Sequence, residues 1–473
     1  MTEHQTTEQP LGKTGDGQCA IEHDNEQQSN EVRRDLVNVE PKSLRTFTPS
    51  MAVIDKSAGA YHWTLEGRRL MDMSSGVLVA NLGHNPTSWW RRFVEYLGVN
   101  ELSDQGGKYV SAAPLTAYNA VTPLEVQASK RLLELMQSQP GGARMQRVMW
   151  AASGSEAIQK ALWAALRWAG GRNKIIATRN GFHGKKGLAG AVTGCETDPE
   201  RDDRVRFVSF PHQECINVVR RTEPIDLAPY RKELQQLSDE FGDSICCLVT
   251  EPYLGGGGSL HPQPEYLQLL QQFCREHNAL FILDEIQANF GRTGTLFAYS
   301  SYGVEPDVVC LGKGLGNGVP VSAAVGAAEV IDCLGYGEGS DTWSANPMST
   351  AGVLATLDEF AAEDIIAQGQ AVSRVLQEGL LKLLETGVIA HVRGEGCVWG
   401  IECQEVGNRS AEQIANECVR AAYLGDEQGF AIHLLGPLAG RVIRISPPLT
   451  TPVGELREHL EALFRIFTRV AQG

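Results

Sequence analysis

The sequence has 473 residues, of which 42% are hydrophobic and 21% are charged, a balance that predicts a globular protein with two or three structural units. Its formal net charge of −15 argues against a surface for nucleic acid or for an anionic membrane. The 11 cysteines are scattered without a zinc-binding spacing, the N-terminus lacks a signal-peptide pattern, and no run of about 18 apolar residues occurs. We therefore expect reduced thiols, a cytoplasmic location, no nucleic-acid or membrane partner and no metal site.

Residues 1–45 are polar and rich in Glu, Gln and Asn, so we expect a flexible tail or, as the alternative, a segment that packs on a partner subunit. Segment 46–100 alternates apolar and polar residues around Gly67, a hairpin-like pattern, and we expect it to join a smaller domain. Across 101–345, short apolar runs alternate with helical segments, which predicts a large domain on a mainly parallel sheet with helices on both faces. Residues 346–473 contain helical segments and two strand-like runs, and they predict a smaller α/β domain.

In such a sheet, ligands bind beyond the carboxyl ends of the strands, so the residues that follow the apolar runs are candidates for a site. The run RVMWAA precedes Ser153, Gly154 and Ser155, which open a helix. The first N–H groups of a helix can bind an anion, but Ser153 can equally be an ordinary N-cap. The run KIIAT precedes a glycine-rich turn with Phe182, which can stack on a flat ring or pack in the core.

Two further runs end in charged residues. ALFILDE carries Asp284, and a carboxylate at the end of a buried strand needs a partner, either a cation such as a pyridinium or the N–H groups of the next turn. DVVCLGK carries Lys313 between Gly312 and Gly314, where neither a P-loop nor a dinucleotide-binding pattern fits. Read alone, this lysine is a solvated loop residue. With partners from the other strand ends, it is an amine that can form a Schiff base with a carbonyl.

Together, the four segments supply a phosphate site, a stacking ring, a carboxylate for a pyridinium nitrogen and an amine, which pyridoxal 5′-phosphate requires. With these residues the sequence resembles the class III pyridoxal-phosphate-dependent aminotransferases. The resemblance covers almost the whole chain beyond the tail, from GAYHWTLEGRRLMDMSSGVLVANLGHNP through SGSEA, GFHG, EP, LDEIQANFGRTG and LGKGLGNGVP to TWSANP and IRISPPLT. It implies the α/β fold type I, with a large domain around a mainly parallel, seven-stranded-type sheet and a smaller α/β domain from both chain ends.

The resemblance also implies roles for single residues. Lys313 would form the Schiff base and carry the proton, Asp284 would keep the ring nitrogen protonated, and Gln287 would hydrogen-bond the ring hydroxyl. Arg444 would bind the substrate carboxylate by a bidentate contact, although it can also be an ordinary arginine on a surface strand. Lys185 would be a second substrate-binding residue. The other cofactor-binding residues would be Ser153, Gly154 and Ser155 at the phosphate, Phe182 on the ring, His183, Glu251, and Thr342, which would reach the phosphate of the neighbouring subunit in a homodimer with shared active sites.

Two departures from the family pattern bear on the substrate. Many members read E-P-x-x-G-E-G-G, where the second glutamate masks the arginine, but this chain reads EPYLGGGG and has Gly256 there. Lys185 stands where 4-aminobutyrate aminotransferases usually carry arginine. A lysine at this position is similar to the pattern of diamine aminotransferases.

We expect a transaminase that moves an amino group from an ω-amino acid, a diamine or a related primary amine to a 2-oxo acid by a ping-pong mechanism. Gln287 and Phe182 favour this activity over an aminomutase or a decarboxylase of the same fold. Intact Lys313 and Asp284 favour it over a non-catalytic protein of this fold. The aminomutase, the decarboxylase and the non-catalytic protein remain the alternatives to a transaminase.

Overall fold

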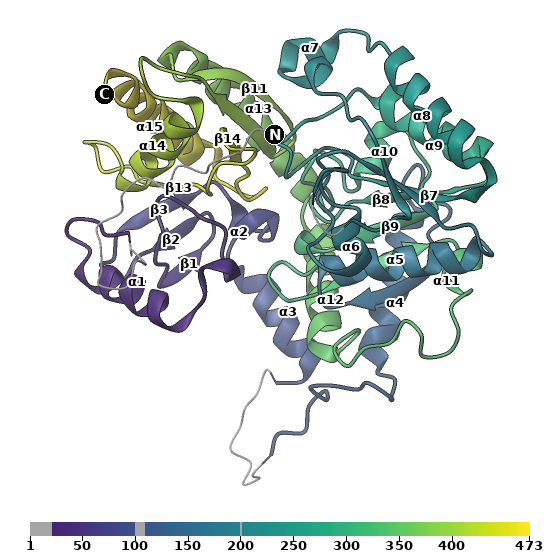
Figure 1. Ribbon diagram of the computed structural model, residues 1–473. Helices are drawn as coiled ribbons and strands as arrows, with labels where there is room; N and C mark the ends of the chain where they lie inside the picture. Colours follow the sequence, from purple (N-terminus) through teal and green to yellow (C-terminus); the bar gives the residue numbers. More distant parts are fainter. Residues whose placement is uncertain (1–20, 100–108, 199–200) are drawn as a thin grey trace.

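The computed structural model describes residues 21–99, 109–198 and 201–473 (Figure 1). Its largest sheet has seven strands in the order β4-β10-β9-β8-β7-β5-β6. Strand β10 runs antiparallel to both of its neighbours, and the other neighbouring pairs are parallel. The predicted mainly parallel, seven-stranded sheet is therefore confirmed. Its strands are β4 (Arg147–Ala151), β5 (Lys174–Thr178), β6 (Val205–Val208), β7 (Ile245–Thr250), β8 (Leu280–Asp284), β9 (Val308–Leu311) and β10 (Ser322–Gly326).

Helices cover both faces of this sheet because its central strands are apolar on both sides. In β8, Leu280 and Ile282 belong to one core cluster with α5 (Gly154–Trp168), whereas Phe281 and Leu283 belong to a second cluster on the other face. The remaining helices of this part are α4 (Pro123–Gln137), α6 (Gly187–Ala191), η2 (Gln213–Cys215), α7 (Val218–Thr222), α8 (Ala228–Phe241), η3 (Gly242–Ser244), α9 (Pro264–Glu276), α10 (Ala298–Tyr302), η4 (Lys313–Leu315) and α11 (Ala328–Ile331).

A smaller α/β lobe is built from both chain ends, as expected, and forms the purple and yellow left-hand part of Figure 1. One antiparallel sheet has the order β11-β12-β14, and a second has the order β1-β2-β3-β13, in which the late strand β13 pairs in parallel with the early strand β3. The strands are β1 (Lys56–Ala58), β2 (Tyr61–Trp63), β3 (Arg69–Asp72), β11 (Ile389–Glu395), β12 (Val398–Cys403), β13 (Ile432–His433) and β14 (Val442–Ile445). Its later helices are α13 (Ile365–Lys382), η5 (Leu383–Thr386), α14 (Ala411–Leu424) and α15 (Val453–Gln472).

Between the two lobes, α12 (Pro347–Ala362) packs against α3 (Thr87–Leu97), and the indole Nε1–H of Trp89 donates to Thr356 Oγ1 at 3.0 Å. The short α2 (Ser75–Leu78) leads into this region. The domain boundaries expected from the sequence, after residues 45, 100 and 345, stay predictions. Within the described ranges no helix is both long and apolar enough to cross a membrane.

The predicted flexible tail, residues 1–45, is wrong for its described part. Residues 21–45 include the helix α1 (Gln27–Val39) and the short η1 (Lys42–Leu44), and residues 1–20 lie outside the described ranges. The buried Arg33 anchors α1: its Nη2 lies 2.7 Å from Glu26 Oε2 and 3.0 Å from the hydroxyl of Tyr423 on α14. The composition argument failed because a buried polar network, rather than apolar burial, fixes this helix.

Arg33→Met is expected to lower the free energy of unfolding by about 1.5–3 kcal/mol, because it removes the hydrogen bond from the buried guanidinium to Glu26 and leaves the more exposed Arg68 as the ion-pair partner of this carboxylate. The matched control is Arg34→Met, which removes the exposed ion pair with Glu22 and should change stability by about 0–1 kcal/mol. Urea unfolding followed by circular dichroism measures both. Equal unfolding midpoints for the two variants would contradict the anchoring role of Arg33.

Candidate active site

Three adjacent parallel strands deliver polar side chains to one edge of the large sheet. Glu251 follows β7, Asp284 ends β8, and Lys313 lies two residues after β9. Because the order β9-β8-β7 is continuous and parallel, these side chains converge. The pKa values of Glu251 and Lys313 both respond to the charge of Asp284, which places the three groups in one electrostatic neighbourhood.

Asp284 is buried and bound to His183. The Nδ1–H of His183 donates to Asp284 Oδ2 at 2.8 Å, and the backbone N–H of Ile286 donates to Oδ1 at 3.0 Å. Burial disfavours the charged imidazole, but the hydrogen bond and the charge of Asp284 outweigh it and raise the pKa of His183. Oδ1 therefore caps the next turn, as one of the two alternatives predicted, whereas a pyridinium partner for Asp284 stays a prediction.

Glu251 holds two loops of the site. Its carboxylate accepts hydrogen bonds from the backbone N–H groups of Phe182 at 2.9 Å and Gly255 at 3.2 Å. Burial, with a contribution from the charge of Asp284, raises the pKa of Glu251 to about 7. Phe182 is 40% exposed and therefore is not packed in the core.

Lys313 is partly buried in a turn that only small neighbours permit. The lysine has a φ of 47°, in the left-handed region, and follows an extended Gly312. A Cβ at Gly312 would lie 2.7 Å from Ser322 Oγ, and one at Gly314 would lie 2.4 Å from Asn81 Nδ2. Burial lowers the pKa of the Lys313 amine to about 8, although the charge of Asp284 opposes this shift. Lys313 is not a solvated loop residue.

The start of α5 combines both predicted possibilities. Ser153 is the N-cap, and its hydroxyl accepts from the N–H of Glu156 at 3.4 Å in a capping box. The N–H groups of Gly154 and Ser155 have no hydrogen-bond acceptor among the described residues, so they remain available to an anion. A Cβ at Gly154 would lie 2.8 Å from Ile286 Cδ1, two residues after Asp284.

The loop Gly255–Gly258 lies directly against other residues of this edge. A Cβ at Gly255 would lie 2.3 Å from Gln287 Oε1, and one at Gly256 would lie 3.2 Å from Phe182 Cβ. Within the described part of the chain, Gln287 Oε1 is buried without a hydrogen-bond partner. A carbonyl oxygen in that state can accept a hydrogen bond from a bound ligand or from water.

Arg444 lies in the middle of β14 and is buried. One Nη2–H donates to the carbonyl oxygen of Gly255 at 2.9 Å, and Nε has no partner within the described ranges. No carboxylate of the described residues lies within 4.0 Å of the guanidinium. Burial lowers the pKa of Arg444. A buried guanidinium with so few partners has donor N–H groups left to bind an anion.

Two predicted residues do not join this cluster within one chain. Lys185 and Thr342 are exposed, and no hydrogen bond or ion pair of the described residues connects them to Lys313, Asp284 or Arg444. The turn at Thr342 is nevertheless ordered. The buried Lys160 amine donates to Asp341 Oδ2 at 2.7 Å and to Ser344 Oγ at 2.9 Å.

Sequence reasoning missed three residues around the site. The Asn289 Nδ2 donates to the carbonyl of Gly312 at 3.1 Å and so ties the LDEIQAN segment to the lysine turn. The hydroxyl of Tyr253 is buried and has no partner among the described residues. Burial raises the pKa of Tyr253, and the charge of Arg444 opposes this shift. Lys160 holds the Thr342 turn. Only Asn289 carried a signal, because it lies inside a motif that already contains Asp284.

The fold and these strand ends define an α/β enzyme of the pyridoxal-phosphate-dependent class. More narrowly, the chain belongs to the class-III aminotransferase family, whose sequence model matches residues 44–467. A 4-aminobutyrate aminotransferase of Mycobacterium leprae is 27% identical over 446 residues, 92% of this chain and 95% of that protein. A 5-aminovalerate aminotransferase of Pseudomonas aeruginosa is 30% identical over 439 residues, 91% of this chain and 96% of that protein.

A solved structure supports the same assignment. The PLP-bound amine transaminase from an uncultivated Pseudomonas species superposes with a TM-score of 0.72 at 26% identity, and the match covers 90% of this chain and 96% of that one. The cofactor of the protein is pyridoxal 5′-phosphate. The residues present fit this group, since they offer two free helix N–H groups, an unpartnered amide oxygen and a side-chain-free loop beside an amine of lowered pKa.

The reaction of the apoenzyme with the cofactor is expected to accelerate as the pH rises and to level off above about pH 8. Only the neutral amine attacks a carbonyl, and the pKa of Lys313 is lowered to about 8 by burial. Stopped-flow absorbance measures the rate. A free lysine derivative is the control, which corrects for titration of the cofactor itself. A rate that keeps rising to pH 10 relative to that control would contradict the lowered pKa.

Proposed function

We propose that this aminotransferase moves an amino group from an ω-amino acid, a diamine or a related primary amine to a 2-oxo acid, in two half-reactions at one site. The observation that carries the proposal is the buried Arg444 guanidinium, which has a backbone carbonyl but no carboxylate as its partner among the described residues. A 2-oxo acid supplies the missing carboxylate, and guanidinium binds that group with two parallel hydrogen bonds.

Each residue around the cofactor would have one task. The pyridoxal phosphate, when bound, supplies a carbonyl for the amine and a ring that accepts electrons. Lys313 would bind it through the amine and then move a proton at the substrate carbon. Asp284, oriented by His183, would keep the ring nitrogen protonated. The others would be Gln287 at the ring hydroxyl, Phe182 and Glu251 on the ring side, and Ser153, Gly154 and Ser155 at the phosphate.

The breadth of donors follows from how Arg444 is held. A glutamate at position 256 would pair with the guanidinium whenever no substrate carboxylate is bound, but Gly256 offers no charge, and Gly255 supplies only a neutral carbonyl. The arginine site would therefore stay receptive to anions throughout the cycle. Lys185, an exposed point charge, would meet the distal end of a longer substrate.

A panel of single-turnover reactions tests the proposal. The cofactor-loaded enzyme is mixed with putrescine, 4-aminobutyrate, 5-aminovalerate or ornithine, and the loss of visible absorbance and the release of the oxo product are followed. Each reacted enzyme is then mixed with pyruvate or 2-oxoglutarate, which should restore the absorbance. If no amine in the panel reacts faster than the enzyme does with alanine alone, the proposed donor class is wrong.

Arg444→Met is expected to raise the KM for the 2-oxo acid by about 10- to 100-fold while kcat changes less, because it removes charge-assisted hydrogen bonds to the bound carboxylate. Steady-state kinetics with a saturating amine measure the split. The matched control is Arg441→Met on the same chain segment, since Arg441 is half exposed and pairs with Glu402. An unchanged KM in Arg444→Met would contradict the proposal that Arg444 binds the carboxylate of the 2-oxo acid.

We further propose a homodimer in which Thr342 acts on the neighbouring subunit's cofactor. In the single chain, Thr342 is exposed and its turn is fixed by Lys160 and Asp341, so the hydroxyl is presented outward. Two large apolar side chains close to it in the sequence, Tyr336 and Trp343, are also exposed. A second copy that covers them would bury apolar surface and bring Thr342 to a phosphate.

A further inference from the structure

A stripe of polar side chains crosses one face of the small β1-β2-β3-β13 sheet. The strand register pairs Ser57 with His62, and His433 with Asp72, and it pairs His62 with Leu70, two residues from Asp72. Because paired residues share a face and side chains alternate along a strand, Ser57, His62, Asp72 and His433 all point to the same side. His84 joins them from the loop after α2, where its backbone pairs with Gly59.

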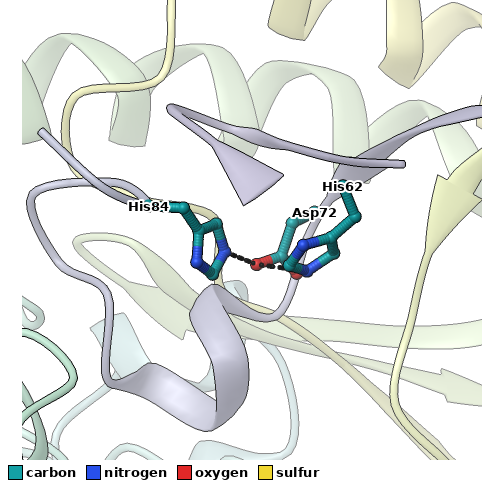
Figure 2. Close-up of side chains that lie close together, drawn as sticks. All are labelled: His62, Asp72 and His84. Atoms are coloured by element: carbon teal, nitrogen blue, oxygen red, sulfur yellow. Dashed lines mark hydrogen bonds and ion pairs between the residues drawn. The ribbon is translucent and has the colours of Figure 1, made fainter. Parts of the chain in front are cut away.

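Three of these side chains direct donor atoms at one point, as Figure 2 shows. His84 Nε2 lies 2.7 Å and His62 Nε2 lies 3.3 Å from the same oxygen, Asp72 Oδ2. All three donor atoms lie within 4.8 Å of one another. Ligand atoms around a tetrahedral zinc ion, at about 2.0–2.2 Å from the metal, are roughly 3.3–3.5 Å apart. Small rotations of the two imidazole rings therefore produce the metal geometry.

In Asp72 and His62, the atoms that face away from this point have their own partners. Asp72 Oδ1 accepts from the backbone N–H of Ser74 at 2.7 Å and from its hydroxyl at 2.6 Å. His62 Nδ1 hydrogen-bonds Ser57 Oγ at 2.7 Å. Such outer contacts fix the orientation of metal ligands and leave the inner atoms free to coordinate.

The charge and the access of the cluster also suit a cation. Asp72 is fully buried, and across the described residues its ion-pair partners are the two imidazoles, with no lysine or arginine. A divalent ion would neutralise this carboxylate while both imidazoles stay neutral. The side chain of His84 is 16% exposed, which gives an entry path. His433 Nδ1 is buried without a partner in the described ranges, and its ring centroid lies 5.3 Å from that of His62.

We propose that His62, Asp72 and His84 form a binding site for a divalent transition-metal ion of the zinc class. Two imidazole nitrogens and one carboxylate oxygen favour such an ion over Mg²⁺ or Ca²⁺. The fourth position belongs to water or to His433. This site is separate from the lysine site and does not depend on the proposed function.

A bound ion would have a structural task. The segment before His84 is tied to the Lys313 turn, since the N–H of Leu82 donates to Asn317 Oδ1 at 3.1 Å and Asn317 Nδ2 donates to the carbonyl of Gly83 at 3.3 Å. Coordination of His84 would fix this segment to β2 and β3. The expectation of no metal rested on cysteine spacing, and it could not detect ligands that meet only through strand register.

Equilibrium dialysis of the cofactor-loaded enzyme against Zn²⁺ alone tests the proposal. The wild-type protein should bind about one ion per chain at this site, and the metal should raise its melting temperature. His62→Gln and His84→Gln should each weaken binding by at least about 10-fold, and Ser57→Ala by about 10-fold through the outer contact. His277→Gln, at the end of α9 in the large domain, is the matched control and should bind zinc like the wild type.

Two results would overturn the site. One is a wild-type protein that retains no more zinc than the His62→Gln/His84→Gln double variant; Asp72 would then be the centre of a hydrogen-bonded histidine pair only. The other, which needs no variant to fold, is a cobalt-loaded wild-type protein without the visible bands of a four-coordinate ion bound by nitrogen and oxygen. Zinc loss in both single variants together with these cobalt bands would support the site.

Discussion

Lys313→Ala is expected to lower the rate of amino transfer by about 10⁴-fold or more. The substitution removes the amine that we propose holds the cofactor and moves the proton. No second lysine is available at this edge of the sheet among the described residues, because Lys160 is engaged by Asp341 and Lys185 is exposed. The turn itself should survive, because Gly312 and Gly314 still allow its close packing.

Two measurements check this result. Steady-state turnover with the best amine of the panel gives the rate, and borohydride reduction followed by peptide mass spectrometry gives the labelled residue, which should be Lys313 in the wild type. The matched control is Lys186→Ala, an exposed lysine three residues after His183 in the sequence, which should keep both turnover and labelling. Full turnover in Lys313→Ala, or a pyridoxyl label on another lysine of the wild type, would show that the assigned role is wrong.

The large sheet and the candidate site at its edge could be predicted because their signals are local. Apolar runs such as ALFILDE and DVVCLGK end where their strands end, and parallel order then places Asp284 beside Lys313 without any knowledge of the tertiary contacts. The capping box at Ser153 and Glu156 is likewise a short-range pattern. These features needed only the order of elements.

Other features depend on contacts between distant parts of the chain. The order of α1 comes from Arg33 meeting Tyr423, 390 residues away in sequence, so composition alone misjudged it. The hydrogen bonding of the Arg444 guanidinium depends on the carbonyl oxygen of Gly255, which belongs to the other lobe. The histidine cluster arises from strand register, in which a shift of one residue would turn His62 to the opposite face.

If the proposed homodimer places Thr342 at the neighbouring cofactor, Thr342→Glu is expected to abolish its activity, with a loss of at least about 10²-fold in cofactor affinity. A carboxylate placed against the phosphate of the cofactor repels it, and like charges in contact cost several kcal/mol. The single chain should still fold, because position 342 is exposed and its turn is held by Lys160 and Asp341. Cofactor titration followed by absorbance measures the loss.

The decisive measurement combines this variant with Lys313→Ala in one dimer. Each variant alone is expected to be inactive. A heterodimer of the two variants is purified through two different tags. If Lys313 and Thr342 of one active site come from different chains, one of its two sites has both residues intact. If they come from the same chain, neither site does. The activity of this heterodimer should be about half that of the wild-type dimer.

A heterodimer of the wild type with the double variant Lys313→Ala/Thr342→Glu is the matched control. If Thr342 serves the neighbouring site, this dimer is inactive, because the one intact Lys313 faces Glu at position 342 of the other chain. If Thr342 serves its own site, the same dimer keeps half of the activity and the first heterodimer has none. The two arrangements give opposite patterns, so the shared active site can be decided from activity alone, without knowledge of the natural amine.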